Sequence, residues 1–321
     1  MKIFLKIAAA VIFSVYLVLA PVFLGRGFNA RKAERSPKVV LEMWHVDSFE
    51  GGTGSRKDFL DRSAAAFEKE NEGVLISVVN HTAESVKANF DRGIRPDLIS
   101  FGVGVTDVRK YAKPLKTRRN GTFFDSGAEG DAAFFYPYAF GNYYIFTSAA
   151  SKGKGAVLSV GKNNFPKFAA KLAGKNYSDA LSPLEAFAAF AGGAYGELIG
   201  TQRDVYRLAR RGVDFEVKPL GIFTDLVQYV AVTAEGENAA SSEKFAEYLL
   251  SDEVQGRLFE IGLFSPTGVK VNYGEPHMDK LKNYPPTAVL TAGLSGEEYG
   301  AIKGADGQDD IFEKFKNYIG Q

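Results

Sequence analysis

After the N-terminal segment, hydrophobic residues follow two kinds of pattern, one typical of strands and one typical of helices. The runs 38–46, 74–82 and 96–102 are rich in β-branched and aromatic residues and predict strands. The segments 55–73 and 83–93 between them place apolar residues at helical spacing and predict helices. Strands that alternate with helices indicate an α/β sheet with parallel neighbours. In such sheets ligands bind beyond the carboxyl ends of the strands.

The second half of the sequence continues the alternation. An aromatic stretch, 134–148, predicts a strand-like crossing that is interrupted at Gly141. Residues 226–233 predict another strand, and 240–262 predict two helices, the first with Ser242 as its N-cap. The frequent interruptions of the hydrophobic runs predict two lobes of modest size, with the chain passing between them more than once.

The N-terminus has the arrangement of an export signal, in which basic residues come before an apolar run. Lys2 and Lys6 precede an uncharged, largely apolar run from Ile7 to Leu24. The run is at the lower edge of what spans a bilayer, so residues 1–28 are expected to be either a cleaved signal peptide or a membrane anchor. A charged linker, 29–37, follows. We therefore expect an extracytoplasmic protein, at the cell surface or in the periplasm, that is membrane-anchored or secreted.

Composition and motifs exclude several functions. Lysine plus arginine (39) nearly balance aspartate plus glutamate (38), which argues against nucleic acid as a partner. The chain has no cysteine, and its three histidines are widely spaced, so no disulfide, thiolate or metal cluster is expected. No G-x-S-x-G, H-E-x-x-H or complete Walker motif occurs. We predict no catalytic residue, no metal and no cofactor.

Polar and aromatic residues at predicted loop and crossing positions suit a carbohydrate. Sugars present hydroxyls to carboxylates, amides and arginines, and apolar ring faces to aromatic side chains. Each residue also has a structural interpretation, as a core aromatic, a helix cap or a surface ion pair. The first and third strands should bring several of them to one crevice, with Trp44 and Phe101 just beyond the strand ends. The candidate ligand-binding residues are Trp44, His45, Asp47, Glu50, Ser55, Arg56, Phe101, Tyr138, Tyr143, Arg203, Asp225 and Gln228.

Two long stretches resemble a known family. "VVLEMWHVDSFEGGTGSRKDFLDRSAAAFEKENEGVLISV", followed by "GIRPDLISFG", is similar to the N-terminal lobe of bacterial extracellular solute-binding proteins of ABC transporters, family 1, the sugar-binding type. "SSEKFAEYLLSDEVQGRLFEIGLFSPTG" resembles that family's helix pair. The resemblance covers 38–321 in outline and is strongest at 38–102 and 222–268.

The resemblance implies a two-lobed periplasmic-binding-protein fold of type II, in which each lobe is a sheet flanked by helices. It places Trp44, Asp47 and Glu50 on the N-lobe side of the ligand cleft. A monomer that captures a small polar ligand, a carbohydrate by the resemblance, and hands it to an ABC permease is then expected. The implied N-lobe comprises 38–138 and 222–266, and the implied C-lobe comprises 139–221 and 267–321.

Two other functions stay open at this point. An exported carbohydrate-acting hydrolase would need a pair of carboxyl groups about 5–9.5 Å apart, drawn from Asp47, Glu50, Asp97 and Asp225. A ligand sensor would present its closed lobes to a membrane kinase, with the N-terminal helix as its tether to the cell membrane.

Overall fold

The fold is taken from a computed structural model. It describes residues 37–49, 52–105, 108–148, 155–159, 164–292, 294, 297–298, 301 and 315. The predicted signal or anchor segment, nearly all of the linker, and Glu50 lie outside the described residues. The compact unit that carries the fold begins at Val39. None of the helices that are described is long and apolar enough to cross a membrane.

The first sheet has five strands in the order β2-β1-β3-β12-β6. Strands β1 (Val39–His45), β2 (Val74–Asn80) and β3 (Leu98–Gly102) are parallel, as the sequence predicts. Strand β12 (Val227–Val232) runs antiparallel to β3, and β6 (Phe135–Phe140) runs antiparallel to β12. The sheet is therefore mixed, and its far edge comes from distant parts of the sequence.

Helices flank this sheet, and their ends follow local capping rules. Ser55 caps α2 by accepting a hydrogen bond from the Asp58 amide, which confirms the predicted start. The prediction of Ser242 as an N-cap is wrong, because Gly236, at a φ of 62°, precedes the helix and Ser242 lies buried inside it. The helical elements are α2 (Arg56–Glu70), α3 (Ala83–Asp91), a 3₁₀ turn (Val108–Lys110), α4 (Thr122–Asp125), α8 (Glu237–Tyr248), α9 (Asp252–Gln255) and a second 3₁₀ turn (Leu258–Glu260).

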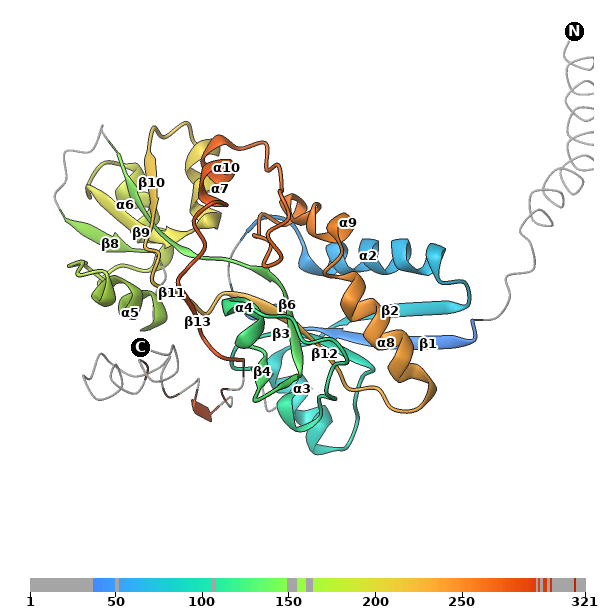
Figure 1. The fold of residues 1–321 in the computed structure, drawn as a ribbon. Helices are drawn as coiled ribbons and strands as arrows, with labels where there is room; N and C mark the ends of the chain where they lie inside the picture. The colour runs from blue at the N-terminus through green and yellow to red at the C-terminus, as the bar shows by residue number, and fades with distance from the viewer. Residues whose placement is uncertain are drawn as a thin grey trace, which may run out of the picture. The chain divides into compact units, whose positions relative to one another are not determined.

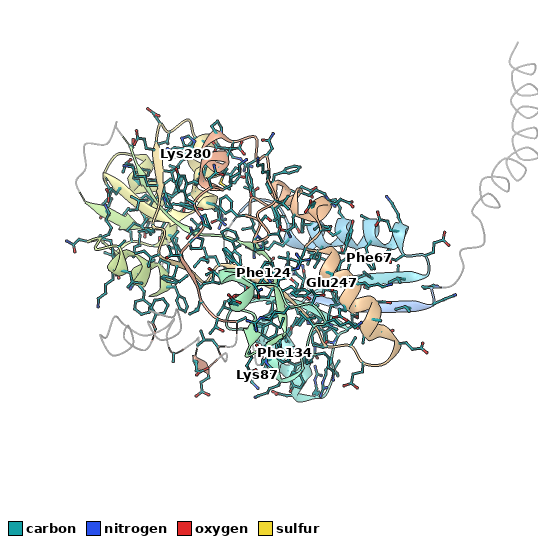
Figure 2. All side chains as sticks on the ribbon, in the orientation of Figure 1. Phe67, Lys87, Phe124, Phe134, Glu247 and Lys280 are labelled. Atoms are coloured by element: carbon teal, nitrogen blue, oxygen red, sulfur yellow. The ribbon has the colours of Figure 1, made fainter. Side chains whose placement is uncertain are left out.

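Aromatic side chains join the helices that cover the first sheet. Phe67 of α2, labelled in Figure 2, contacts Phe245 of α8 edge-on, with 5.3 Å between the ring centroids, and lies 5.4 Å from the Tyr248 ring. Val86 and Phe90 are the buried residues of α3. Burial of such rings contributes much of a domain's hydrophobic stabilisation and fixes the sheet whose strand ends carry the candidate site.

The second sheet has four strands in the order β10-β7-β9-β8. Strand β9 pairs antiparallel with β7 and parallel with β8. Its strands are β7 (Tyr143–Thr147), β8 (Ala156–Leu158), β9 (Glu197–Thr201) and β10 (Glu216–Pro219). Its helices are α5 (Asn164–Leu172), α6 (Pro183–Ala191), α7 (Gln202–Arg210) and α10 (Pro276–Leu281) (Figure 1).

The chain passes between the sheets at more than one place. The predicted crossing is interrupted at Gly141, where β6 ends and β7 follows. The Gly141 amide donates to Leu226 O at 2.6 Å, and Thr224 Oγ1 donates to Gly141 O at 2.8 Å. Beside this crossing, β11 (Phe223–Thr224) pairs in parallel with β13 (Ala288–Val289). In the first lobe, β4 (Ala128–Glu129) and β5 (Ala132–Ala133) form a small hairpin.

Candidate functional site

A buried polar network lies at the carboxyl ends of β1 and β3. His45 is the last residue of β1 and is in register with Ser100 of β3. The His45 ring joins two neighbours, with Nδ1 2.9 Å from Ser100 Oγ and Nε2 3.2 Å from Asp47 Oδ1. His45 and Ser100 are fully buried, so the network links the core of the sheet to the loop that follows β1.

Ser100 is the centre of this network. Its Oγ lies 2.8 Å from Tyr138 OH of β6 and accepts from Gln228 Nε2 of β12 at 2.9 Å. Gln228 Nε2 also donates to Val46 O at 3.1 Å. The topology thus brings together His45, Tyr138 and Gln228, three of the candidate residues from the sequence, as members of a buried network. Sequence reasoning missed Ser100, although a serine inside the apolar run 96–102 is itself a signal of a buried polar partner.

The protons of this network can be assigned with a neutral His45 ring. In this assignment Gln228 and Tyr138 donate to the two acceptor positions of Ser100 Oγ, whose own proton remains. The Ser100 proton then goes to Nδ1 of His45, and Nε2–H donates to the Asp47 carboxylate. This assignment satisfies every member of the buried network and makes it rigid.

Arg56, the first residue of α2, binds the same carboxylate oxygen of Asp47 that His45 contacts. Its Nη1 donates to Asp47 Oδ1 at 3.1 Å, Nη2 donates to Phe49 O at 2.8 Å, and its guanidinium lies 4.0 Å over the Phe49 ring. The Arg56 side chain is only 7% exposed, whereas that of Asp47 is 64% exposed. A rigid, buried scaffold therefore presents one carboxylate to solvent, which is the arrangement a polar ligand requires.

Asp47 is expected to titrate at an unusually low pH. The hydrogen bond from His45 lowers the pKa of Asp47 most, and the positive charge of Arg56 acts in the same direction against the effect of burial. Because the pKa of Asp47 is lower in the folded than in the unfolded chain, its contribution to stability is present above about pH 4 and is lost as the pH falls through the folded-state value. Carboxyl NMR should give a midpoint below about 3.9. A midpoint at or above that value would contradict the prediction.

A second polar group lies at the crossing between the sheets. Tyr143 OH donates to Asp225 Oδ1 at 2.5 Å, and both residues are buried. Asn142 Oδ1 accepts from the Tyr143 amide, and Gln202 Oε1 accepts from the Asn142 amide. The amide nitrogens of Asn142 and Gln202 are buried with no hydrogen-bond partner among the described residues. Arg203, next along α7, is exposed.

The sequence-based placement of Trp44 and Phe101 beyond the strand ends is wrong. Trp44 lies within β1 and is 2% exposed, with His81 and Phe90 at 4.4 and 5.8 Å from its ring. Phe101 lies within β3 and contacts Phe135 at 5.2 Å. Side chains alternate between the two faces of a strand, so Trp44 points to the face opposite His45. Both aromatic residues belong to the core.

The remaining sequence candidates contribute differently. Ser55 is exposed, and its hydroxyl caps α2. Glu50 lies outside the described residues, so its place relative to Asp47 is not part of the described geometry. Within the described part of the chain, no group of histidines and acids is arranged to hold a metal ion.

Two α/β lobes joined by several crossings define the periplasmic-binding-protein fold, and this chain has that fold. Solved structures share it, among them a sugar-binding protein. MalE of Xanthomonas citri is 13% identical, with 87% of this chain and 96% of that chain covered and a TM-score of 0.61. RafE of Streptococcus pneumoniae is 12% identical, with 89% and 98% covered and a TM-score of 0.61.

The GacH receptor of Streptomyces glaucescens, solved unliganded and with acarbose and an acarbose homolog, is also similar. It is 14% identical, with 89% of this chain and 94% of that chain covered and a TM-score of 0.58. No family model matches the sequence, and no curated protein matches it. At these identities the likeness establishes the fold.

Proposed function

We propose that this protein captures a small carbohydrate between its two lobes, outside the cytoplasm, and delivers it to an ABC permease. The observation that carries the proposal is the exposed carboxylate of Asp47, held by buried Arg56 and His45 at the carboxyl edge of the first sheet. Carboxylates that are fixed in this way accept hydrogen bonds from ligand hydroxyls with little loss of side-chain entropy. The fold shared with sugar-binding proteins supports a sugar as the donor of those hydroxyls.

Lobe closure is the proposed mechanism. The N-lobe, 38–138 and 222–266, supplies Asp47, and the C-lobe, 139–221 and 267–321, closes over the ligand from the crossing that carries Tyr143 and Asp225. A ligand that contacts both lobes only in the closed state shifts the equilibrium between the open and closed states by the difference in its binding free energy for the two states. The N-terminal segment is proposed to export the chain or tether it to the membrane, and the protein is proposed to act as a monomer.

Binding without turnover is the favoured activity, although Asp47, His45 and Ser100 are connected in the order of a hydrolytic triad. A nucleophilic serine must reach a substrate and be free to transfer its proton. Ser100 Oγ is fully buried and already contacts Tyr138 and Gln228 as well as His45. These contacts argue against a role as nucleophile.

Calorimetry on the full chain tests the proposal with neutral mono- and oligosaccharides, including maltose and maltotriose. The matched variants are Asp47→Asn and Asp61→Asn. Asp61 is another partly exposed carboxylate, and it pairs with Lys57 on α2. Loss of a hydrogen bond to a charged group costs about 1.5–3 kcal/mol, so Asp47→Asn should weaken binding roughly 10- to 150-fold. Asp61→Asn should leave the affinity unchanged.

Three results would oppose the proposal. If titration with every sugar gives no heat of binding, the ligand is not one of these carbohydrates and the assignment fails. Equal losses in Asp47→Asn and Asp61→Asn would remove Asp47 from the site. Consumption of the sugar during the titration would favour the hydrolase.

A further inference from the structure

A cavity of about 350 Å³ lies beside the start of β6 and is lined by residues of 109–135 and of 291–298. Strands β3 and β6 both run antiparallel to β12, so the start of β6 lies at the end of the sheet opposite to the carboxyl end of β3. Phe134 and Phe135, at this start, line the cavity. The cavity is therefore separate from the network around Asp47, and its volume is in the range of small-molecule sites, about 300–1,000 Å³.

An ion pair over an aromatic ring forms one wall. Arg109 Nε and Nη2 both donate to Glu129 Oε2, at 2.8 and 2.5 Å, and the guanidinium carbon lies 3.3 Å from the centroid of Phe134. Among the described residues, Nη1 of Arg109 and Oε1 of Glu129 have no hydrogen-bond partner. The two side chains are 38% and 70% exposed, so a ligand can reach both.

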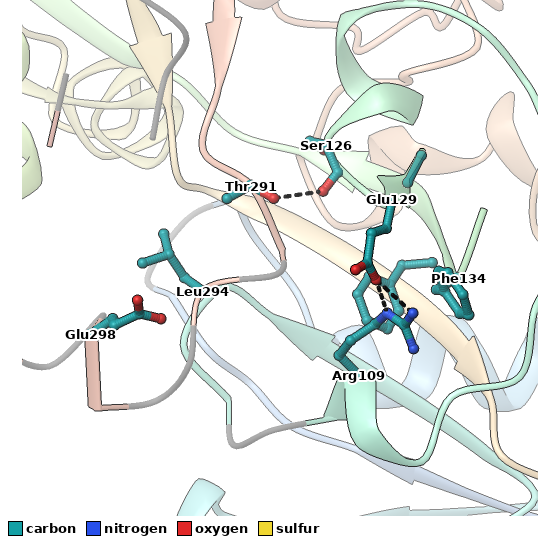
Figure 3. A pocket seen from close by; sticks show the side chains of 10 residues that line it. Arg109, Ser126, Glu129, Phe134, Thr291, Leu294 and Glu298 are labelled. Carbon is teal, nitrogen blue, oxygen red and sulfur yellow. Dashed lines mark hydrogen bonds and ion pairs between the residues drawn. The ribbon is translucent and has the colours of Figure 1, made fainter. Parts of the chain in front are cut away.

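Leu294 and the exposed carboxylate of Glu298 line the opposite side, and the hydroxyls between the two sides are engaged. Figure 3 shows Leu294 across the cavity from Arg109 and Glu129. Thr291 Oγ1 donates to Ser126 O at 3.3 Å, and Ser126 Oγ donates to Phe123 O at 2.6 Å. These hydroxyls are engaged within the protein, so the ion pair, together with the Glu298 carboxylate, supplies the charged groups of the cavity.

We propose that this cavity binds a free α-amino acid with an apolar side chain. The ligand carboxylate accepts from Nη1 of Arg109, its ammonium donates to Oε1 of Glu129, and its side chain packs against Leu294 and Phe135. A cationic donor beside an anionic acceptor is complementary to a zwitterion, and hydrogen bonds between charged groups are roughly twice as strong as those between neutral groups. This second ligand goes beyond the proposed carbohydrate function, and its site does not depend on that function.

Calorimetry of the full chain with L-leucine and L-phenylalanine tests this proposal. L-Leucinamide lacks the carboxylate, and 4-methylpentanoate lacks the ammonium. Each analogue should bind at least tenfold more weakly than leucine. Arg109→Gln and Glu129→Gln should each weaken leucine binding at least tenfold.

The chain offers a matched control in Arg62→Gln. Arg62 donates through Nε and Nη2 to Glu260 Oε2, at 3.0 and 2.6 Å, and its side chain is 51% exposed, so it repeats the ion pair outside the cavity. This variant should bind leucine normally, and its melting temperature shows the cost of losing such a pair.

Absence of heat with both amino acids at millimolar concentration would overturn the proposal, as would equal affinity for leucine and leucinamide. A neutral sugar that competes with leucine and loses affinity in Arg109→Gln would overturn the amino-acid assignment. Sugar binding that depends on Asp47 but not on Arg109 would leave the two sites distinct, so the two proposals fail independently.

Discussion

Replacement of Trp44 with alanine is expected to lower the free energy of unfolding by about 3–5 kcal/mol, the usual cost of truncating a buried aromatic residue to alanine. The indole is 2% exposed, contacts His81 and Phe90, and donates from Nε1 to Glu42 Oε1 at 2.6 Å. Chemical denaturation followed by circular dichroism measures the loss. Circular dichroism is needed because the variant has no tryptophan left to report by fluorescence.

Trp44→Phe is the control for this prediction. Phenylalanine keeps a ring against Phe90 but loses the hydrogen bond to Glu42, so it should cost clearly less than alanine. A variant Trp44→Ala that stays as stable as the wild type but loses sugar binding would contradict the core assignment. That result would mean that Trp44 contacts the ligand.

The order of strands and helices could be predicted well from the sequence because periodicity reports which face of an element is buried. The strands 38–46, 74–82 and 96–102 correspond to β1, β2 and β3, and the interruption at Gly141 separates β6 from β7. Sheet order was not accessible in this way. The pairing of β12 with β3 joins residues more than 120 positions apart, and no local pattern specifies such a pair.

The candidate site was predicted in part. Asp47 and Arg56 were candidates because they lie in or next to the loop that follows the first strand. They are nine positions apart, so this short loop is enough to bring them into contact. Side chains alternate between the two faces of a strand, so a difference of one position decides whether an aromatic residue near a strand end faces a crevice or the core. Trp44 and Phe101 fell on the core side for that reason.

Residues that were missed share another property. Ser100, Asn142 and Gln202 are uncharged polar residues, and their importance comes from partners that are distant in the sequence. Arg109 and Glu129 are 20 positions apart and meet only because of the hairpin that precedes β6. Pairings of this kind become visible only once the topology is known.

The most informative single change within the candidate site is Ser100→Ala. It removes one oxygen and leaves His45 Nδ1 and Tyr138 OH without their hydrogen-bond partner, while Gln228 Nε2 keeps only Val46 O. A buried polar group that loses its partner costs about 1–3 kcal/mol. We therefore expect the free energy of unfolding to fall by about 2–4 kcal/mol and sugar affinity to fall with it, because His45 then no longer orients Asp47.

Ser63→Ala separates this effect from the loss of any buried hydroxyl. Ser63 is also fully buried, but its Oγ makes a single hydrogen bond, to Phe59 O one turn back in α2, at 2.8 Å. Alanine is the better helix former at that position, so Ser63→Ala should be nearly neutral. If denaturation shows equal losses for the two variants, Ser100 is not the centre of the network. A loss confined to Ser100→Ala, with weaker sugar binding, would tie the orientation of the exposed carboxylate to a hydroxyl buried two residues from the end of β3.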